Sequence, residues 1–281
     1  MGGGPPPLDG VAATPPCDSD IYARLVRARR VWAVAAIHGA VDRVIALHAR
    51  LAPHLNAGDR LVYLGNYLGA GTASAATLDA LIHFRRLFLA RRNAFLGDIA
   101  FLRGTQEEMW QKLLELQFAP NPREVLPWML DRGVDKTLAS YGMDAREGLA
   151  ACREGVLAIT RWTAALRAAI DARPGHRRFL NSLRRAAFTD DGALLFVHAG
   201  IDPSKPLDLQ GDRFWWWDRD ILELAAPFAG FRRVVRGIDR DHRGLIEAPH
   251  AVSIDGGSGF GGPLMAACFA PDGTIVERID A

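Results

Sequence analysis

VWAVAAIHGAVDRVIALHARLAPHL, residues 31–55, contains the pattern that decides the fold. Its first part, residues 31–39, is a run of apolar and β-branched residues that ends in glycine, which predicts a buried strand and a turn. Apolar residues then recur at helical spacing from Val41 to Leu55, which predicts an amphipathic helix. The segment is therefore a strand, a glycine turn and a helix in succession.

The same order of elements recurs twice farther along the chain. Residues 60–71, RLVYLGNYLGAG, predict a strand and a glycine-rich loop, and residues 77–92 carry the apolar stripe of a helix. Residues 99–104, IAFLRG, predict a third strand, followed by a helix in which Thr105 and Glu108 would form a capping box. Three such units are typical of an α/β fold, whose loops gather at the carboxyl ends of the strands, where ligands bind.

The remainder of the chain divides into a helical block and a set of strands. Residues 106–188 favour helices, and the C-terminal third returns to strand patterns. The predicted strands lie in ALLFVHAG (193–200), FRRVVRG (231–237), AVSIDGGSGFGGPLMAACFA (251–270) and TIVERID (274–280). Strands after a helical block favour a second sheet packed on the first. We therefore expect an α/β fold built as a two-sheet β-sandwich flanked by helices.

The composition is that of a globular protein. The 281 residues are 49% hydrophobic, and 34 basic against 32 acidic residues give a formal charge of +2. This balance excludes a disordered chain and gives no indication of a nucleic-acid partner. Residues 1–20 combine glycine and proline with few large apolar side chains, so we expect a flexible N-terminal tail. Residues 21–281 are expected to form a single domain.

Cysteine usage and apolar runs bear on the location of the protein. Cys17, Cys152 and Cys268 lie far apart, without the spacing of a zinc site or a disulfide framework. The apolar stretch from Val31 to Val41 is interrupted by His38 and is shorter than the roughly 18 to 20 residues that span a bilayer. We therefore expect no membrane partner and a cytoplasmic location.

Five glycine-containing segments that follow predicted strands point to a known family. They are AAIHGA (35–40), GNYLGAG (65–71), LRGTQEE (102–108), FVHAGIDP (196–203) and VVRGIDR (234–240). In this order they resemble the motifs GDxHG, GDxxDRG, GNHE, HAG and GHT of the phosphoprotein phosphatase branch of the calcineurin-like metallophosphoesterases. The resemblance to the bacterial serine/threonine phosphatases of this branch extends over residues 30–281 and implies their fold.

The resemblance also implies a site at which most metal ligands are lost. The family places two divalent ions on these motifs, and of the six expected ligands only His38 and His198 remain. The other ligand positions hold Ala36, Asn66, Thr105 and Ile238. A bridging ligand needs an anionic carboxylate, whereas an asparagine offers one neutral carbonyl oxygen. Two imidazoles alone do not hold a dinuclear hydrolytic centre.

The positions that would perform proton transfer are changed as well. Gln106 stands at the family's general-acid position, where a histidine is expected, although Glu107 persists beside it. Gly69 and Ala70 replace the second aspartate and the arginine of the GDxxDRG motif. A glutamine amide does not donate a proton to a leaving group. No catalytic residue of the family is therefore intact.

A metal site formed by neighbouring residues is the first alternative. A single divalent ion such as manganese, iron or zinc could be held by carboxylates or imidazoles close to the lost positions. The candidates are Asp42, Asp59, Asp98, Asp239, Asp241 and His242. The default expectation remains that no cofactor is bound.

Arginines near the motifs suggest a phosphate-bearing ligand or phosphoprotein as a partner. Arg103 and Arg236 lie in motif segments, and Arg219 lies where the family has a phosphate-binding arginine. Arginine is suited to bidentate contact with phosphate. Trp215, Trp216 and Trp217 would pack under the site or form a contact surface for another protein.

The favoured interpretation is a catalytically inactive pseudophosphatase that acts by binding a ligand or a protein. One alternative is an active phosphoesterase with a displaced or single metal. The other is a structural subunit in which the pocket is vestigial.

Overall fold

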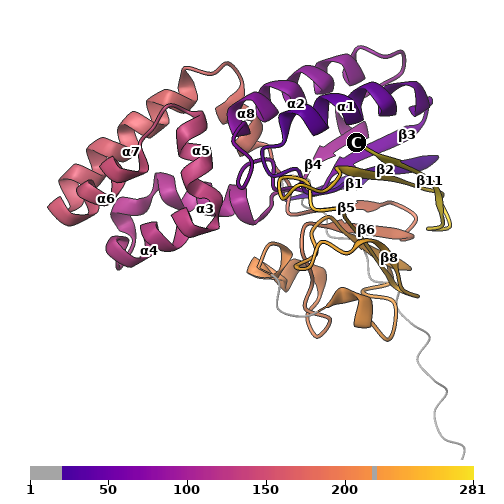
Figure 1. The fold of residues 1–281 in the computed structure, drawn as a ribbon. Helices are drawn as coiled ribbons and strands as arrows, with labels where there is room; N and C mark the ends of the chain where they lie inside the picture. Colours follow the sequence, from indigo (N-terminus) through magenta and orange to yellow (C-terminus); the bar gives the residue numbers. More distant parts are fainter. Residues whose placement is uncertain (1–20, 217–219) are drawn as a thin grey trace, which may run out of the picture.

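The computed structural model describes residues 21–216 and 220–281 and contains two β-sheets flanked by helices (Figure 1). The strands are β1 Tyr22–Leu25, β2 Arg30–Val34, β3 Asp59–Tyr63, β4 Ile99–Phe101, β5 Ala186–Thr189, β6 Leu194–Val197, β7 Arg233–Arg236, β8 Gly244–Glu247, β9 Ala251–Asp255, β10 Met265–Phe269 and β11 Ile275–Asp280. The helices are α1 Val41–Leu51, α2 Ser74–Leu89, α3 Thr105–Leu114, α4 Pro122–Met129, α5 Asp135–Ser140, α6 Ala145–Glu154, α7 Val156–Asp171 and α8 His176–Asn181.

Both sheets mix parallel and antiparallel pairs. One has the order β11-β10-β2-β3-β4, in which β2, β3 and β4 run parallel. The other has the order β1-β5-β6-β7-β9-β8, in which β6, β7 and β9 run parallel. Phe196 of β6 meets Phe269 of β10 edge to face, with ring centroids 5.9 Å apart, so the sheets pack on each other. The predicted two-sheet α/β sandwich is confirmed.

The predicted strand, turn and helix units are all present. Strands β2, β3 and β4 are followed by α1, α2 and α3. In Figure 1, α1 and α2 lie along the sheet that contains β2 and β3, whereas α3 to α7 gather at one side of the sheets. The parallel strands β2 to β4 therefore present the loops after them at one edge of the sheet.

Two local predictions are wrong. The helical block ends at Asn181, before residue 188, because Ala186–Thr189 joins the second sheet as β5. The capping box does not involve Thr105 and Glu108, since α3 begins at Thr105 and the residue before it is Gly104. Glu107 accepts the hydrogen bond from the Gly104 N–H at 2.9 Å.

The N-terminal segment and the cysteines differ in what the structure describes of them. Residues 1–20, including Cys17, lie outside the described residues. Cys152 and Cys268 are free, buried thiols. No helix within residues 21–216 and 220–281 is long and apolar enough to cross a membrane.

Candidate functional site

The loops that carry the predicted site positions meet between the two sheets. The His38 N–H, after β2, donates to the Asn66 carbonyl, after β3, at 2.6 Å. The Ala36 N–H donates to the Gly237 carbonyl at 2.9 Å, and the Gly237 N–H donates to the His198 carbonyl at 3.0 Å. The structure therefore brings together loops that are up to 200 residues apart in the chain.

The amide of Asn66 lies in a fixed orientation against His38. The Gln106 backbone N–H donates to Asn66 Oδ1 at 2.9 Å, which identifies the other amide atom as the NH₂ group. This NH₂ group faces His38 Nε2 at 3.3 Å. His38 Nε2 therefore accepts, the proton of the neutral ring is on Nδ1, and Nδ1 is buried without a hydrogen-bond partner.

His198 is held in the same tautomer, with its proton on Nδ1. Its Nδ1–H donates to the Leu64 carbonyl at 2.6 Å, which leaves a lone pair on Nε2. Nε2 faces Thr105 Oγ1 at 3.3 Å, but the Thr105 hydroxyl donates to the Trp215 carbonyl at 2.6 Å. Thr105 therefore serves as a connection between α3 and the Trp215 segment.

Both histidines are neutral near physiological pH. Burial lowers the pKa of His38 to about 3 and that of His198 to about 4. For His38, the neighbouring His198 and His242 act in the same direction. Imidazoles in this state supply hydrogen-bonding atoms but no positive charge.

We expect these burial effects to make the protein less stable in mild acid. His38, His48 and His198 are buried, and each has a folded-state pKa far below the unfolded value of about 6.5. The unfolded chain therefore takes up more protons as the pH falls through 6.5. The free energy of unfolding should decrease by about 1 to 2 kcal/mol per buried histidine between pH 7 and pH 5. Urea unfolding at both pH values measures this change.

NMR titration provides the control for this prediction. The ring resonances of His38 and His198 should not move between pH 5 and pH 8 in the native state, whereas all histidines should titrate near pH 6.5 in urea. A native-state titration of both rings in that range, or equal stability at pH 5 and pH 7, would contradict it.

Glu107 supports the loop that contains Asn66. One carboxylate oxygen accepts from the Asn66 and Gly104 N–H groups at 2.9 Å each, and the other accepts from Tyr67 and Leu68 at 2.8 and 3.1 Å. Burial raises the pKa of Glu107, and these four donors oppose the shift because they stabilise the ionised form. Only the persistence of Glu107 in the motif hinted at this role before the structure was known.

Gln106 connects the site to the helical block. Its Nε2 donates to the Arg132 carbonyl at 2.8 Å, whereas its Oε1 is buried without a partner. Gly69 packs directly against it: a Cβ added at Gly69 would lie 2.6 Å from Gln106 Cδ. Gly69 also has a φ of +111°, and its N–H donates to Thr137 Oγ1 at 3.1 Å. Thr137 and Arg132 carry no local motif that would have identified them.

The donor set does not fit a dinuclear metal centre. Ala36 and Ile238 have no donor atoms, and both amide atoms of Asn66 are engaged with Gln106 and His38. Among residues 21–216 and 220–281, no group of three or more His, Cys, Asp or Glu side chains is placed to hold a metal ion.

The residues considered for a displaced metal site have other partners or lie at the surface. Asp59 pairs with Arg30 at 2.6 Å. Asp98 pairs with Arg60 at 3.2 Å, at the start of β4 rather than at its carboxyl end. His242 Nδ1 contacts Asp255 at 2.7 Å. Asp42 and Asp241 are exposed, and Asp239 belongs to the ion-pair cluster of Arg236.

Of the arginines predicted to bind a ligand, the two that the structure describes, Arg236 and Arg103, are engaged in ion pairs within the fold. Arg236 is buried, and its guanidinium contacts Asp220 at 3.0 Å, Asp239 at 3.1 Å and Ser253 Oγ at 3.0 Å. This environment does not agree with a ligand-binding role, because the buried charge is engaged within the fold. Arg103 bonds to Glu108 at 3.1 Å. Arg219 and Trp217 lie outside the described residues.

Aromatic side chains border the site. Phe260 contacts the His38 ring edge to face and stacks on His242, yet it is 57% exposed. Trp215 is buried and directly follows a short 3-10 helix, Gly211–Phe214. Trp216 packs against Trp128, with ring centroids 5.7 Å apart. Phe260 lies among glycines in GGSGFGG, the segment directly after β9. A large aromatic residue in a glycine-rich loop after a strand was the pattern that could have identified it.

Comparison with known proteins supports the fold. No protein-family model and no curated protein sequence matches the chain. A solved structure of a candidate diadenosine tetraphosphatase is similar at 21% identity and a TM-score of 0.55, over 93% of this chain and 98% of that one. A Saccharomyces cerevisiae serine/threonine phosphatase with similarity to human phosphatase PP5 is similar at 14% identity and a TM-score of 0.51, over 94% and 84%. A cold-active protein tyrosine phosphatase is similar at 12% identity and a TM-score of 0.50, over 92% and 80%. The chain has the calcineurin-like phosphoesterase fold.

Proposed function

We propose that this protein is a pseudophosphatase, which uses a phosphoesterase fold to bind a ligand or partner protein and does not hydrolyse phosphate esters. The observation that carries the proposal is the environment of Asn66. It occupies the position of the bridging carboxylate, and both of its amide atoms are engaged in hydrogen bonds within the site. A neutral hydrogen-bond network stands where a metal bridge would be needed.

Hydrolysis of a phosphate ester in this family requires two metal ions and a general acid, and the residues at these positions do not provide for them. Two metal ions would need to activate a water and to neutralise charge on the phosphoryl oxygens. Asn66, Ala36 and Ile238 do not supply the anionic ligands for them. Gln106 has no proton to give to a leaving group, and its NH₂ group is directed to the Arg132 carbonyl.

The described residues favour recognition by neutral hydrogen bonds over recognition of a phosphate. His38 and His198 are uncharged, and Arg236 is engaged with two aspartates. Two buried atoms remain without partners, His38 Nδ1 as a donor and Gln106 Oε1 as an acceptor. A ligand or a peptide group with both an acceptor and a donor complements this pair.

Metal analysis together with turnover tests the proposal. Protein expressed in medium with manganese and purified without chelator should carry far less than one equivalent of tightly bound transition metal. Turnover of p-nitrophenyl phosphate with added Mn²⁺ should equal that of a Gln106→Ala variant, because position 106 performs no proton transfer. One or more equivalents of metal, with turnover that is removed by EDTA, would favour the active-phosphoesterase alternative.

A further inference from the structure

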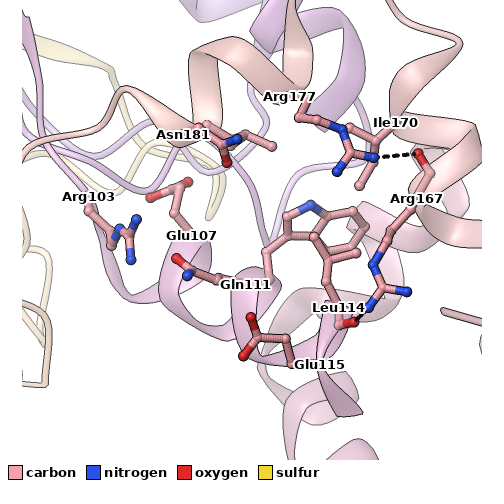
Figure 2. Close-up of a pocket in the computed structure, with 11 residues that line it drawn as sticks. Arg103, Glu107, Gln111, Leu114, Glu115, Arg167, Ile170, Arg177 and Asn181 are labelled. Carbon is pink, nitrogen blue, oxygen red and sulfur yellow. Dashed lines mark hydrogen bonds between the residues drawn. The ribbon is translucent and has the colours of Figure 1, made fainter. Parts of the chain in front are cut away.

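A second candidate ligand site lies between α3, α7 and α8 and shares only Arg103 and Glu107 with the motif segments described above. It is a cavity of about 210 Å³. Figure 2 shows side chains from the three helices converging on it, with Arg167 and Arg177 at one end and Arg103 at the other. The cavity is smaller than the pockets of roughly 300 to 1,000 Å³ that hold drug-sized ligands. Its size suits a small metabolite.

The positive charge at one end of the cavity is not fully compensated. The Arg167 guanidinium donates to the Leu114 carbonyl and, at 3.4 Å, to Thr163 Oγ1, which are both neutral. Within the described parts of the chain, Arg167 makes no ion pair with a carboxylate. Arg177 pairs with Asp171 and donates to the backbone carbonyl of Arg167 at 3.3 Å, and the side chains of both arginines line the cavity. An oxyanion placed between them would complete the charge balance.

The carboxylates near the cavity do not oppose an anion strongly. Both oxygens of Glu107 are saturated by two backbone N–H donors each, and these dipoles offset its charge. Glu115 is exposed to solvent, where its field is screened. Gln111 and Asn181 add carboxamide groups that can hydrogen-bond to a polar ligand.

The walls supply an apolar surface and an unused donor. Leu114, Ile170 and Leu180 line the cavity together with Trp110. Trp110 is 2% exposed, and its indole Nε1–H is buried without a partner. Buried donors in native proteins are nearly always paired, so an unpaired one at a cavity indicates a missing acceptor.

We propose that this cavity binds a small organic anion, whose carboxylate or phosphate group lies between Arg167 and Arg177 and whose short apolar body packs against Trp110 and Ile170. The inference does not depend on the proposed function, because none of the metal-ligand positions lines the cavity. Helix α3 carries Gln106 and Glu107 of the candidate site as well as Trp110 of this cavity, so one helix contacts both.

Calorimetric titration of the full chain tests the proposal with four probes. Succinate and glycerol 3-phosphate supply the two kinds of oxyanion, and succinamide and glycerol are their uncharged counterparts, all at ionic strength matched with sodium chloride. We expect saturable binding of at least one anion and none of the uncharged probes. Binding of succinate alone would assign a carboxylate ligand, and binding of glycerol 3-phosphate alone would assign a phosphate ester.

Substitutions in the cavity lining test whether the anion binds in this cavity. Arg167→Gln should weaken anion binding by about tenfold or more, since one charge-assisted contact is lost. Asn181→Asp should also weaken it, because it adds a negative charge to the lining. Arg161→Gln, an exposed position on the same helix, should bind like the wild type.

Two tryptophan variants distinguish the loss of the indole N–H donor in the cavity from the general effect of replacing a buried tryptophan. Trp110→Phe should weaken binding, whereas Trp162→Phe should not, although Trp162 is also buried with an unpaired Nε1. Circular dichroism and unfolding midpoints establish that each variant is folded. Absence of saturable binding by both anions, or wild-type affinity in folded Arg167→Gln, would overturn the proposal.

Discussion

Glu107→Gln is expected to lower the free energy of unfolding by about 3 kcal/mol. Four backbone N–H groups donate to the two carboxylate oxygens of Glu107. A glutamine keeps one oxygen and directs an NH₂ group at the other pair of donors, so buried donors lose their acceptor. Each such loss costs about 1 to 3 kcal/mol. Urea unfolding monitored by circular dichroism gives the value.

Glu115→Gln is the matched control for this prediction. Glu115 is exposed and directly follows α3, the helix that contains Glu107. Its substitution should change the unfolding free energy by no more than about 0.5 kcal/mol. Equal effects of the two substitutions would contradict the role assigned to Glu107 in holding the loop of Asn66.

Asn66→Asp, which places a carboxylate where the motif resemblance expects a bridging ligand, should destabilise the protein by about 2 to 4 kcal/mol at pH 8. Asn66 is 1% exposed, and its NH₂ group donates to His38. Asn66 Oδ1 and Glu107 Oε2 both lie within 3.0 Å of the place where a Cβ on Gly104 would stand, so the new charge would face an existing one. The difference from wild type should shrink towards pH 5, because the introduced carboxylate takes up a proton. Thermal and urea unfolding at both pH values measure it.

Asn93→Asp controls for the backbone conformation at this position. Asn93 has a φ of +60°, close to the +52° of Asn66, but it is exposed. Its substitution should be nearly neutral. Manganese should not restore the stability of Asn66→Asp, since Ala36 and Ile238 still supply no ligands. Restoration by manganese would mean that a metal site persists, against the proposed function.

Local sequence patterns predicted the strands and helices that are specified by their own residues. The segments after Arg30, Arg60 and Asp98 each combine an apolar strand with a helical stripe, and β2, β3 and β4 form there with their helices. Strands β1, β5 and β8 were missed. Each has four residues, and their pairing partners, not their own patterns, make them strands.

In the candidate site too, local patterns predict some of the arrangement and long-range contacts determine the rest. The loops after the parallel strands β2, β3 and β4 share one edge of their sheet, as the motif order predicts, and the loop after β6 of the other sheet meets them there. This arrangement brings together His38, Asn66, Thr105, Gln106 and His198. The ion pairs that bury Arg236 depend on Asp220 and on the fold around Ser253, which no local pattern specifies. Burial also removes the charge of the two histidines, so counting basic residues overestimated the positive charge of the site.

The contact between Gly69 and Gln106 makes the acquisition of an aspartate at position 69 dependent on the order of mutations. Any side chain at position 69 starts with a Cβ that collides with Gln106, and the backbone there has a conformation that favours glycine. An aspartate at 69 therefore becomes acceptable only after position 106 and the local backbone have changed, and neither change alone supplies a metal ligand. Intermediates along such a path lose stability, so an aspartate at this position meets a barrier of strongly coupled substitutions.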